Sequence, residues 1–95
     1  MENSPQQLAI KRRKLAQEYN ENMKMIAELR QRKAIRIIEL LDKHKTASKA
    51  EIYYNAEPDG QELIKLELYS KGLLELMRSV KTEVEIKQSE AYNQY

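Results

Sequence analysis

Basic side chains recur along the first half of the chain, and two adjacent tyrosines, Tyr53 and Tyr54, follow them. Cations placed close together bind phosphate groups, and exposed aromatic rings stack on unpaired bases. The sequence therefore predicts contacts to single-stranded nucleic acid, with one of the two tyrosines stacking on bases. The residues predicted to bind phosphates are Lys11, Arg12, Arg13, Lys14, Arg30, Arg32, Lys33, Arg36, Lys43, Lys45 and Lys49.

Each of these features also has a purely structural interpretation. The run Lys11-Arg12-Arg13-Lys14 spreads around a helix and is compatible with a solvated helix end. The cations between residues 30 and 36 share helix faces and can pair with acidic side chains of the same or a neighbouring chain. The tyrosines can pack over the end of a helical hairpin. Because adjacent helical positions diverge by about 100°, both tyrosines cannot serve one face equally.

Side chains suited to catalysis are scarce. His44 is the single histidine and there is no cysteine, so a nucleophile activated by a neighbouring base lacks a clear pair of residues. The two glycines are too few for a glycine-rich phosphate loop, and no Glu-x-x-His motif of the di-iron type is present. We therefore predict a protein that is not an enzyme, with His44 solvated at the surface and with no metal or cofactor.

Few prolines and glycines interrupt a composition that is typical of helices. Ser4-Pro5-Gln6-Gln7 predicts a helix start, in which Ser4 and Gln7 form a capping box and Pro5 takes the first helical position. Glu57-Pro58-Asp59-Gly60 predicts a turn. A lone Gly72 in the following helix is predicted to allow another helix to approach closely. The predicted organisation is a single domain over residues 1–95, with a first arm over about 5–56, a turn over about 57–60 and a second arm over about 61–92.

Apolar residues recur at three- and four-residue steps in both arms, which is the period of an amphipathic helix. The pattern weakens at Lys43-His44-Lys45-Thr46, and Ser48-Lys49-Ala50-Glu51 has the form of a second capping box. A kink or restart over residues 44–48 and an unbroken helix are both compatible with this pattern. The apolar stripes consist of Leu8, Leu15, Tyr19, Ile26, Leu29, Ile37 and Leu41 in the first arm, and Leu63, Leu66, Leu73, Met77, Val80 and Val84 in the second.

The two halves of the chain carry opposite charge. Residues 1–50 hold twelve Lys/Arg against six Asp/Glu (net +6), and residues 51–95 hold five against nine (net −4). An antiparallel arrangement places the basic arm beside the acidic arm. We therefore predict an all-α fold, an antiparallel helical hairpin or coiled coil with long arms. Because a chain of 95 residues without Trp or Phe buries a small core, we also expect a homo-oligomer.

No apolar run approaches the roughly 20 residues that span a bilayer. The first five residues, Met1-Glu2-Asn3-Ser4-Pro5, lack the apolar core of a signal peptide. We therefore expect no membrane association and a cytoplasmic protein.

The segment Lys49-Ala50-Glu51-Ile52-Tyr53-Tyr54-Asn55-Ala56-Glu57-Pro58-Asp59-Gly60 resembles the Lys-Ala…Tyr-Tyr…Asp-Gly segment of phage recombination mediator proteins, the UvsY family. Downstream, Lys71, Ser79 and Val84 have spacings similar to those of the next helix in that family, so the resemblance covers residues 49–88. It implies a small helical oligomer that binds single-stranded DNA and helps to load a recombinase onto strands covered by single-strand-binding protein. The compartment is the host cytoplasm if a phage encodes the chain.

These observations predict a non-enzymatic accessory protein of phage or mobile-element DNA recombination or replication. Its expected partners are single-stranded DNA and a recombinase or another protein. Two alternatives stay open: an adaptor or inhibitor of a host or defence protein that uses the acidic second arm, and a structural coiled-coil component of a larger assembly such as a virion. Binding through several phosphates weakens steeply with salt, which separates the first function from the other two.

Overall fold

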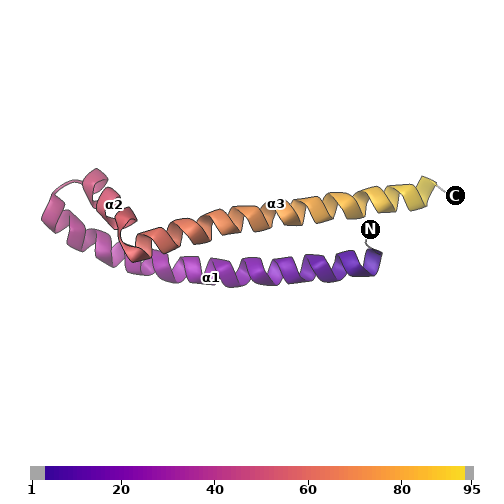
Figure 1. The fold of residues 1–95 in the computed structure, drawn as a ribbon, viewed down its shortest axis with the longest axis horizontal. Helices are drawn as coiled ribbons and strands as arrows, with labels where there is room; N and C mark the ends of the chain where they lie inside the picture. The colour runs from indigo at the N-terminus through magenta and orange to yellow at the C-terminus, as the bar shows by residue number, and fades with distance from the viewer. Residues whose placement is uncertain (1–3, 94–95) are drawn as a thin grey trace. The chain divides into compact units, whose positions relative to one another are not determined.

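The computed structural model describes residues 4–93, with side chains up to residue 90. Within that range the chain forms three α-helices and no strand: α1 (Pro5–His44), α2 (Ala47–Ala56) and α3 (Pro58–Asn93) (Figure 1). The prediction of an all-α fold is confirmed. None of the three helices contains, in its described residues, an apolar stretch long enough to cross a bilayer.

Contacts divide the chain into two compact units, and each unit contains part of α1 and part of α3. Unit 1 comprises Met1–Glu21 and Lys71–Tyr95, and unit 2 comprises Asn22–Ser70. In unit 1 the first part of α1 lies beside the later part of α3. In unit 2 the remainder of α1 lies beside α2 and the first part of α3 (Figure 1). Within each unit α1 and α3 run in opposite directions, as the hairpin prediction requires.

The predicted start of α1 is confirmed in detail. The backbone N–H of Gln7 donates to Ser4 Oγ at 3.1 Å, and the backbone N–H of Ser4 donates to Gln7 Oε1 at 2.9 Å. Each side chain therefore satisfies an N–H group that a helix start leaves without a partner. Pro5 takes the first helical position, where its missing N–H costs nothing.

The chain breaks between α1 and α2, which decides the question that the sequence left open over residues 44–48. Lys45 has a left-handed backbone (φ 70°), and its N–H donates to Leu41 O at 2.7 Å, which is how many helices end. Thr46 is extended, and its hydroxyl accepts from the N–H of Lys49 at 3.3 Å, so Thr46 caps α2. The predicted capping box at Ser48 is therefore wrong, because Ser48 already lies inside the helix.

A single residue, Glu57, separates α2 from α3, so the turn is shorter than the predicted four residues. Pro58 disfavours helical backbone at the residue before it, and Glu57 is accordingly extended (φ −75°, ψ 158°). Pro58 then opens α3. A Cβ on Gly60 would overlap Tyr54 O and lie 2.8 Å from Asn55 Cα, so this close approach of α3 to the end of α2 requires glycine.

The predicted apolar stripes form the cores of the two units. Every residue of both stripes is buried or half-buried, from Leu8 to Leu41 in α1 and from Leu63 to Val84 in α3. Gly72, in contrast, faces open space, with no neighbouring atom within 4 Å of a Cβ placed there. The close helix approach predicted at Gly72 is therefore absent from the described part of the chain. The core cluster of unit 2 consists of Ile26, Leu29, Leu40, Ala50, Tyr54 and Leu63.

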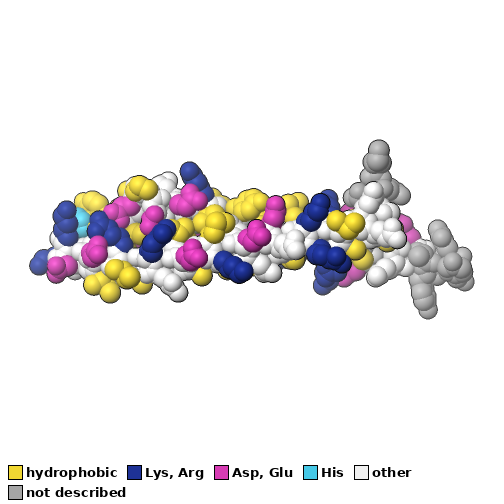
Figure 2. Space-filling model, turned by 90° about the horizontal axis from the view of Figure 1, so that it is seen from below, with side chains coloured by type: hydrophobic (Ala, Val, Ile, Leu, Met, Phe, Trp, Pro, Cys, Tyr) yellow, Lys and Arg dark blue, Asp and Glu magenta, His cyan; other side chains and the backbone are white. Residues whose placement is uncertain are grey.

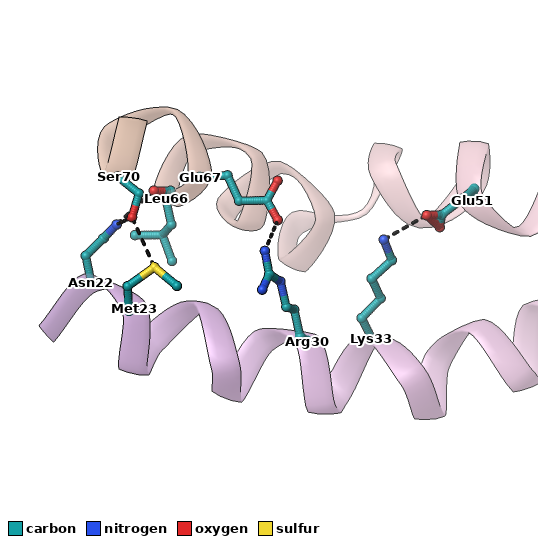
Figure 3. A network of polar contacts seen from close by, with 8 residues as sticks. All are labelled: Asn22, Met23, Arg30, Lys33, Glu51, Leu66, Glu67 and Ser70. Carbon is teal, nitrogen blue, oxygen red and sulfur yellow. Dashed lines mark hydrogen bonds and ion pairs between the residues drawn. The ribbon is translucent and has the colours of Figure 1, made fainter. Parts of the chain in front are cut away.

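A polar side chain, Asn22, interrupts the apolar seam of unit 2. It is 2% exposed, and its Nδ2 donates to Leu66 O at 2.8 Å and to Ser70 Oγ at 2.9 Å (Figure 3). The Ser70 hydroxyl in turn donates to Met23 Sδ at 3.4 Å. Because these hydrogen bonds form in one alignment of α1 with α3, they favour the observed register over its neighbours.

Candidate nucleic-acid interface

Four of the cations predicted to bind phosphates are engaged in ion pairs within unit 2. Arg30 pairs with Glu67 at 3.3 Å, and Lys33 pairs with Glu51 at 2.8 Å (Figure 3). The other two pairs, with their shortest N–O distances, are Arg32–Asp59 at 3.3 Å and Arg36–Glu57 at 2.8 Å. The partners come from α2, from α3 and from the residue between them. These four contacts therefore follow the alternative in which the cations pair with acidic side chains of the same chain, although of the four partners only Glu67 lies in the predicted second arm.

The Arg36 pair has the most complete hydrogen bonding of the four. Its Nε donates to both carboxylate oxygens of Glu57, at 2.9 and 3.1 Å, and its Nη2 adds a bond of 2.8 Å. Its Nη1 donates to Glu39 at 2.8 Å. The hydrogen bonds from Arg36 lower the pKa of Glu57, and those accepted by Glu57 and Glu39 raise the pKa of Arg36. This guanidinium is therefore engaged by carboxylates, and its bonds to Glu57 hold the junction between α2 and α3 against α1.

The two tyrosines are in different environments. Tyr54 is 1% exposed in the core of unit 2, and Lys33 Nζ lies 5.3 Å from its ring centroid. Burial is the main cause that raises the pKa of Tyr54. Tyr53 is 50% exposed. Only Tyr53 therefore presents a ring to solvent, and the predicted stacking on bases narrows to this residue.

Tyr53 stacks on His44 across the break between α1 and α2. The two ring centroids are 3.8 Å apart and the ring planes differ by 11°. His44 is half-buried, whereas the sequence predicted a solvated side chain at the surface. The break between α1 and α2 brings the two rings into contact, because the chain turns back there and residues nine positions apart become neighbours.

Three exposed lysines lie close in the chain to the residues of the stacked rings. Lys43 and Lys45 flank His44 in the chain, and Lys49 lies one helical turn before Tyr53 on α2. Within residues 4–90 no carboxylate forms an ion pair with any of the three. Figure 2 shows the histidine with Lys and Arg side chains close by. We call His44, Tyr53 and the lysines at positions 43, 45 and 49 the corner cluster.

The corner cluster combines a flat aromatic surface with positive charge that is not neutralised internally. The N-terminal turn of α2 contributes the positive end of a helix dipole, and the last turn of α1, which contains Lys43 and His44, contributes a negative end, so the positive charge of the cluster comes from its lysines. The arrangement can therefore bind an anion and a flat ring together. No nucleophile with an adjacent base occurs in the cluster, and no three His, Asp or Glu side chains within residues 4–90 gather in a way that could hold a metal ion.

The run Lys11-Arg12-Arg13-Lys14 lies in unit 1, on the exposed surface of α1. Arg12 and Arg13 line a groove of unit 1, and the two lysines do not. The four side chains thus spread around the helix, as the sequence indicated, and they are not part of the corner cluster.

Sequence reasoning selected the lysines and Tyr53 but missed the histidine beside them. The signal was weak, because His44 and Tyr53 fall on different helices and become neighbours only through the left-handed Lys45. No protein-family model, curated protein or solved structure matches this chain.

Proposed function

We propose that this protein is a non-enzymatic accessory protein that binds single-stranded DNA through the corner cluster. The observation that carries the proposal is the parallel stack of His44 and Tyr53, 3.8 Å apart, among three lysines without an ion-pair partner in the described residues. A base that stacks on the exposed part of Tyr53 extends the pair of rings. The lysines reach the phosphates on either side of that base.

The chemistry of the cluster favours single strands over duplexes. In a duplex both faces of each base are covered by neighbouring bases, whereas an unpaired base can stack on a protein ring. Lysine binds phosphate as a flexible point charge and reads no base edge in a fixed geometry. We therefore expect binding with little sequence preference.

The resemblance of residues 49–88 to recombination mediators supports the finer proposal that the bound strand is handed to a recombinase. Lys49 and Tyr53 of the corner cluster lie inside that stretch. The expected assay readout is faster recombinase loading onto strands covered by single-strand-binding protein.

The proposal is tested at Tyr53 by titrating fluorescent single-stranded DNA. Tyr53→Ala removes the stacking surface, so we expect the dissociation constant to rise roughly 5- to 150-fold, the equivalent of about 1–3 kcal/mol per stacked base. Tyr53→Phe is the matched control, because it keeps the ring and should bind as the wild type does. Equal affinity of all three proteins would contradict the stacking role.

A protein-binding adaptor is the second candidate function. Ile35 and Ile38 are 64% and 69% exposed and lie one turn apart on α1 of unit 2. Such a pair is a small apolar surface of the kind that interfaces cover. An adaptor binds one particular protein, and Ile35→Ser/Ile38→Ser weakens that binding while leaving DNA affinity unchanged.

A further inference from the structure

A groove in unit 1 shares no residue with the corner cluster and combines small apolar side chains with arginines. Its volume is about 490 Å³, and residues from both ends of the described chain line it. Ala9 and Ala16 lie two turns apart on α1 and leave space for an approaching helix. Arg12 and Arg13 lie between them in the chain and add two positive charges. The full lining is Pro5, Ala9, Arg12, Arg13, Ala16, Val84 and Gln88.

The lining identifies the chemistry of the occupant. Arg12 and Arg13 form no ion pair with any carboxylate in the described part of the chain. A phosphate backbone would engage the two arginines but would leave the alanines, Pro5 and Val84 uncovered. An amphipathic helix with one large apolar side chain between carboxylates satisfies both parts of the groove.

The same chain presents such a helix face on α3. Ile86 is 53% exposed. Glu83 and Glu90 lie three residues before and four residues after it, so all three share one face of the helix. Neither glutamate forms an ion pair within residues 4–90. The face therefore has the apolar residue and the negative charges that the groove lacks.

We propose that the groove of unit 1 binds the Glu83–Ile86–Glu90 face of α3 from a second copy of this chain. Ile86 inserts between Ala9 and Ala16, and the two glutamates pair with Arg12 and Arg13. The glutamates lie seven residues apart, about 10 Å along the helix, with Ile86 near the middle. Arg12 and Arg13 diverge by about 100° around α1, so their long side chains leave the helix in different directions and each can reach one glutamate.

This contact cannot be exchanged symmetrically between two molecules. Val84 and Gln88 line the groove, and Ile86 is turned by about 200° from each of them around α3. The groove and the Ile86 face therefore lie on opposite sides of the helix. Each pairing leaves one groove and one Ile86 face free, so the copies associate head to tail and the assembly extends beyond a dimer.

Two charge-reversed variants, measured alone and mixed, test this proposal, with self-association followed by sedimentation. Arg12→Glu/Arg13→Glu makes the groove acidic, and Glu83→Arg/Glu90→Arg makes the α3 face basic. Each variant alone should associate at least about a hundredfold more weakly than the wild type, because like charges then face each other. An equimolar mixture should regain association, since both contacts between the two variants join opposite charges. Circular dichroism on each variant checks that helix content is unchanged.

Two further variants of this chain distinguish self-association from DNA binding. Ile86→Ser should also abolish association, and because Ile86 is half exposed it should leave the unfolding midpoint nearly unchanged. Lys45→Ala/Lys49→Ala should associate as the wild type does and lose DNA affinity. Wild-type association by both charge-reversed variants, or no recovery on mixing, would overturn the proposal. The proposal would also be overturned if Arg12→Glu/Arg13→Glu associated as the wild type does but bound DNA more weakly. That result would assign the groove to nucleic acid.

Discussion

Replacing Gly60 by alanine should destabilise the protein, whereas the same replacement at Gly72 should stabilise it. Both glycines lie within α3 and neither has a positive φ, so the backbone accepts alanine at both positions. The surroundings differ. A Cβ at residue 60 would overlap Tyr54 O and approach Asn55 Cα to 2.8 Å, whereas a Cβ at residue 72 would have no neighbour within 4 Å.

The expected change in the free energy of unfolding is the sum of a gain from helix propensity and a cost from overpacking. Alanine is favoured over glycine inside a helix by about 1 kcal/mol; this gain applies in full at Gly72, whereas Gly60 is the third residue of α3 and gains at most that amount. At residue 60 the added methyl group meets backbone atoms of α2, which cannot rotate away as a side chain does, so the overpacking cost lies at or above about 3 kcal/mol. The net change in the free energy of unfolding is a loss of at least about 2 kcal/mol for Gly60→Ala and a gain of up to about 1 kcal/mol for Gly72→Ala.

Thermal unfolding followed by circular dichroism measures both changes. For a domain of this size 1 kcal/mol corresponds to about 4–8 °C, so the midpoint should fall by about 10 °C or more for Gly60→Ala and rise by up to about 8 °C for Gly72→Ala. A rise for both variants would refute the reasoning, because it would mean that α2 and α3 do not approach closely at Gly60.

Three other perturbations test the ion pair and the buried polar groups. Arg36 lowers the pKa of Glu57, so the stability that this pair contributes is present above the ordinary Glu pKa of about 4.3 and is lost as the pH falls through the lower folded pKa. In Glu57→Gln, the free energy of unfolding should therefore fall less steeply with decreasing pH over this range. Tyr54→Phe removes a buried hydroxyl with no hydrogen-bond partner in the described residues and should raise stability by about 1 kcal/mol. It should also remove the loss of stability above about pH 10 that a raised tyrosine pKa causes, as a pH series of urea unfolding would show. A double-mutant cycle of Asn22→Ala and Ser70→Ala should give a coupling of roughly 1 kcal/mol by urea unfolding, and additive effects would contradict the hydrogen bond between them.

The helices could be predicted because their determinants are local. The capping box at Ser4 and the apolar period of both arms depend only on residues within a few positions of each other. The end of α1 was harder, since Thr46 and Ser48 can both cap a helix. The choice between them depends on how α2 packs against α1 through Ala50 and Tyr54, which are buried in the core of unit 2.

The site depends on contacts that no local pattern contains. The charges of α1 indicated that some cations would pair internally, but their partners follow from the register between helices. Lys33 meets Glu51 on α2, whereas Arg30 meets Glu67 on α3. The stack of His44 on Tyr53 likewise exists only because Lys45 adopts a left-handed conformation, which a lysine rarely does.

The salt dependence of single-stranded DNA binding tests the role of the corner cluster most directly. Three lysine contacts to phosphates predict a slope of log affinity against log salt of about −2, which is roughly a 20-fold loss between about 50 and 200 mM salt. In Lys43→Ala/Lys45→Ala/Lys49→Ala the slope should fall close to zero. The control Lys24→Ala/Lys65→Ala/Lys71→Ala removes the same charge from exposed positions elsewhere and should keep the wild-type slope. Equal slopes for the two triple variants would contradict the assignment of the DNA site to the corner cluster.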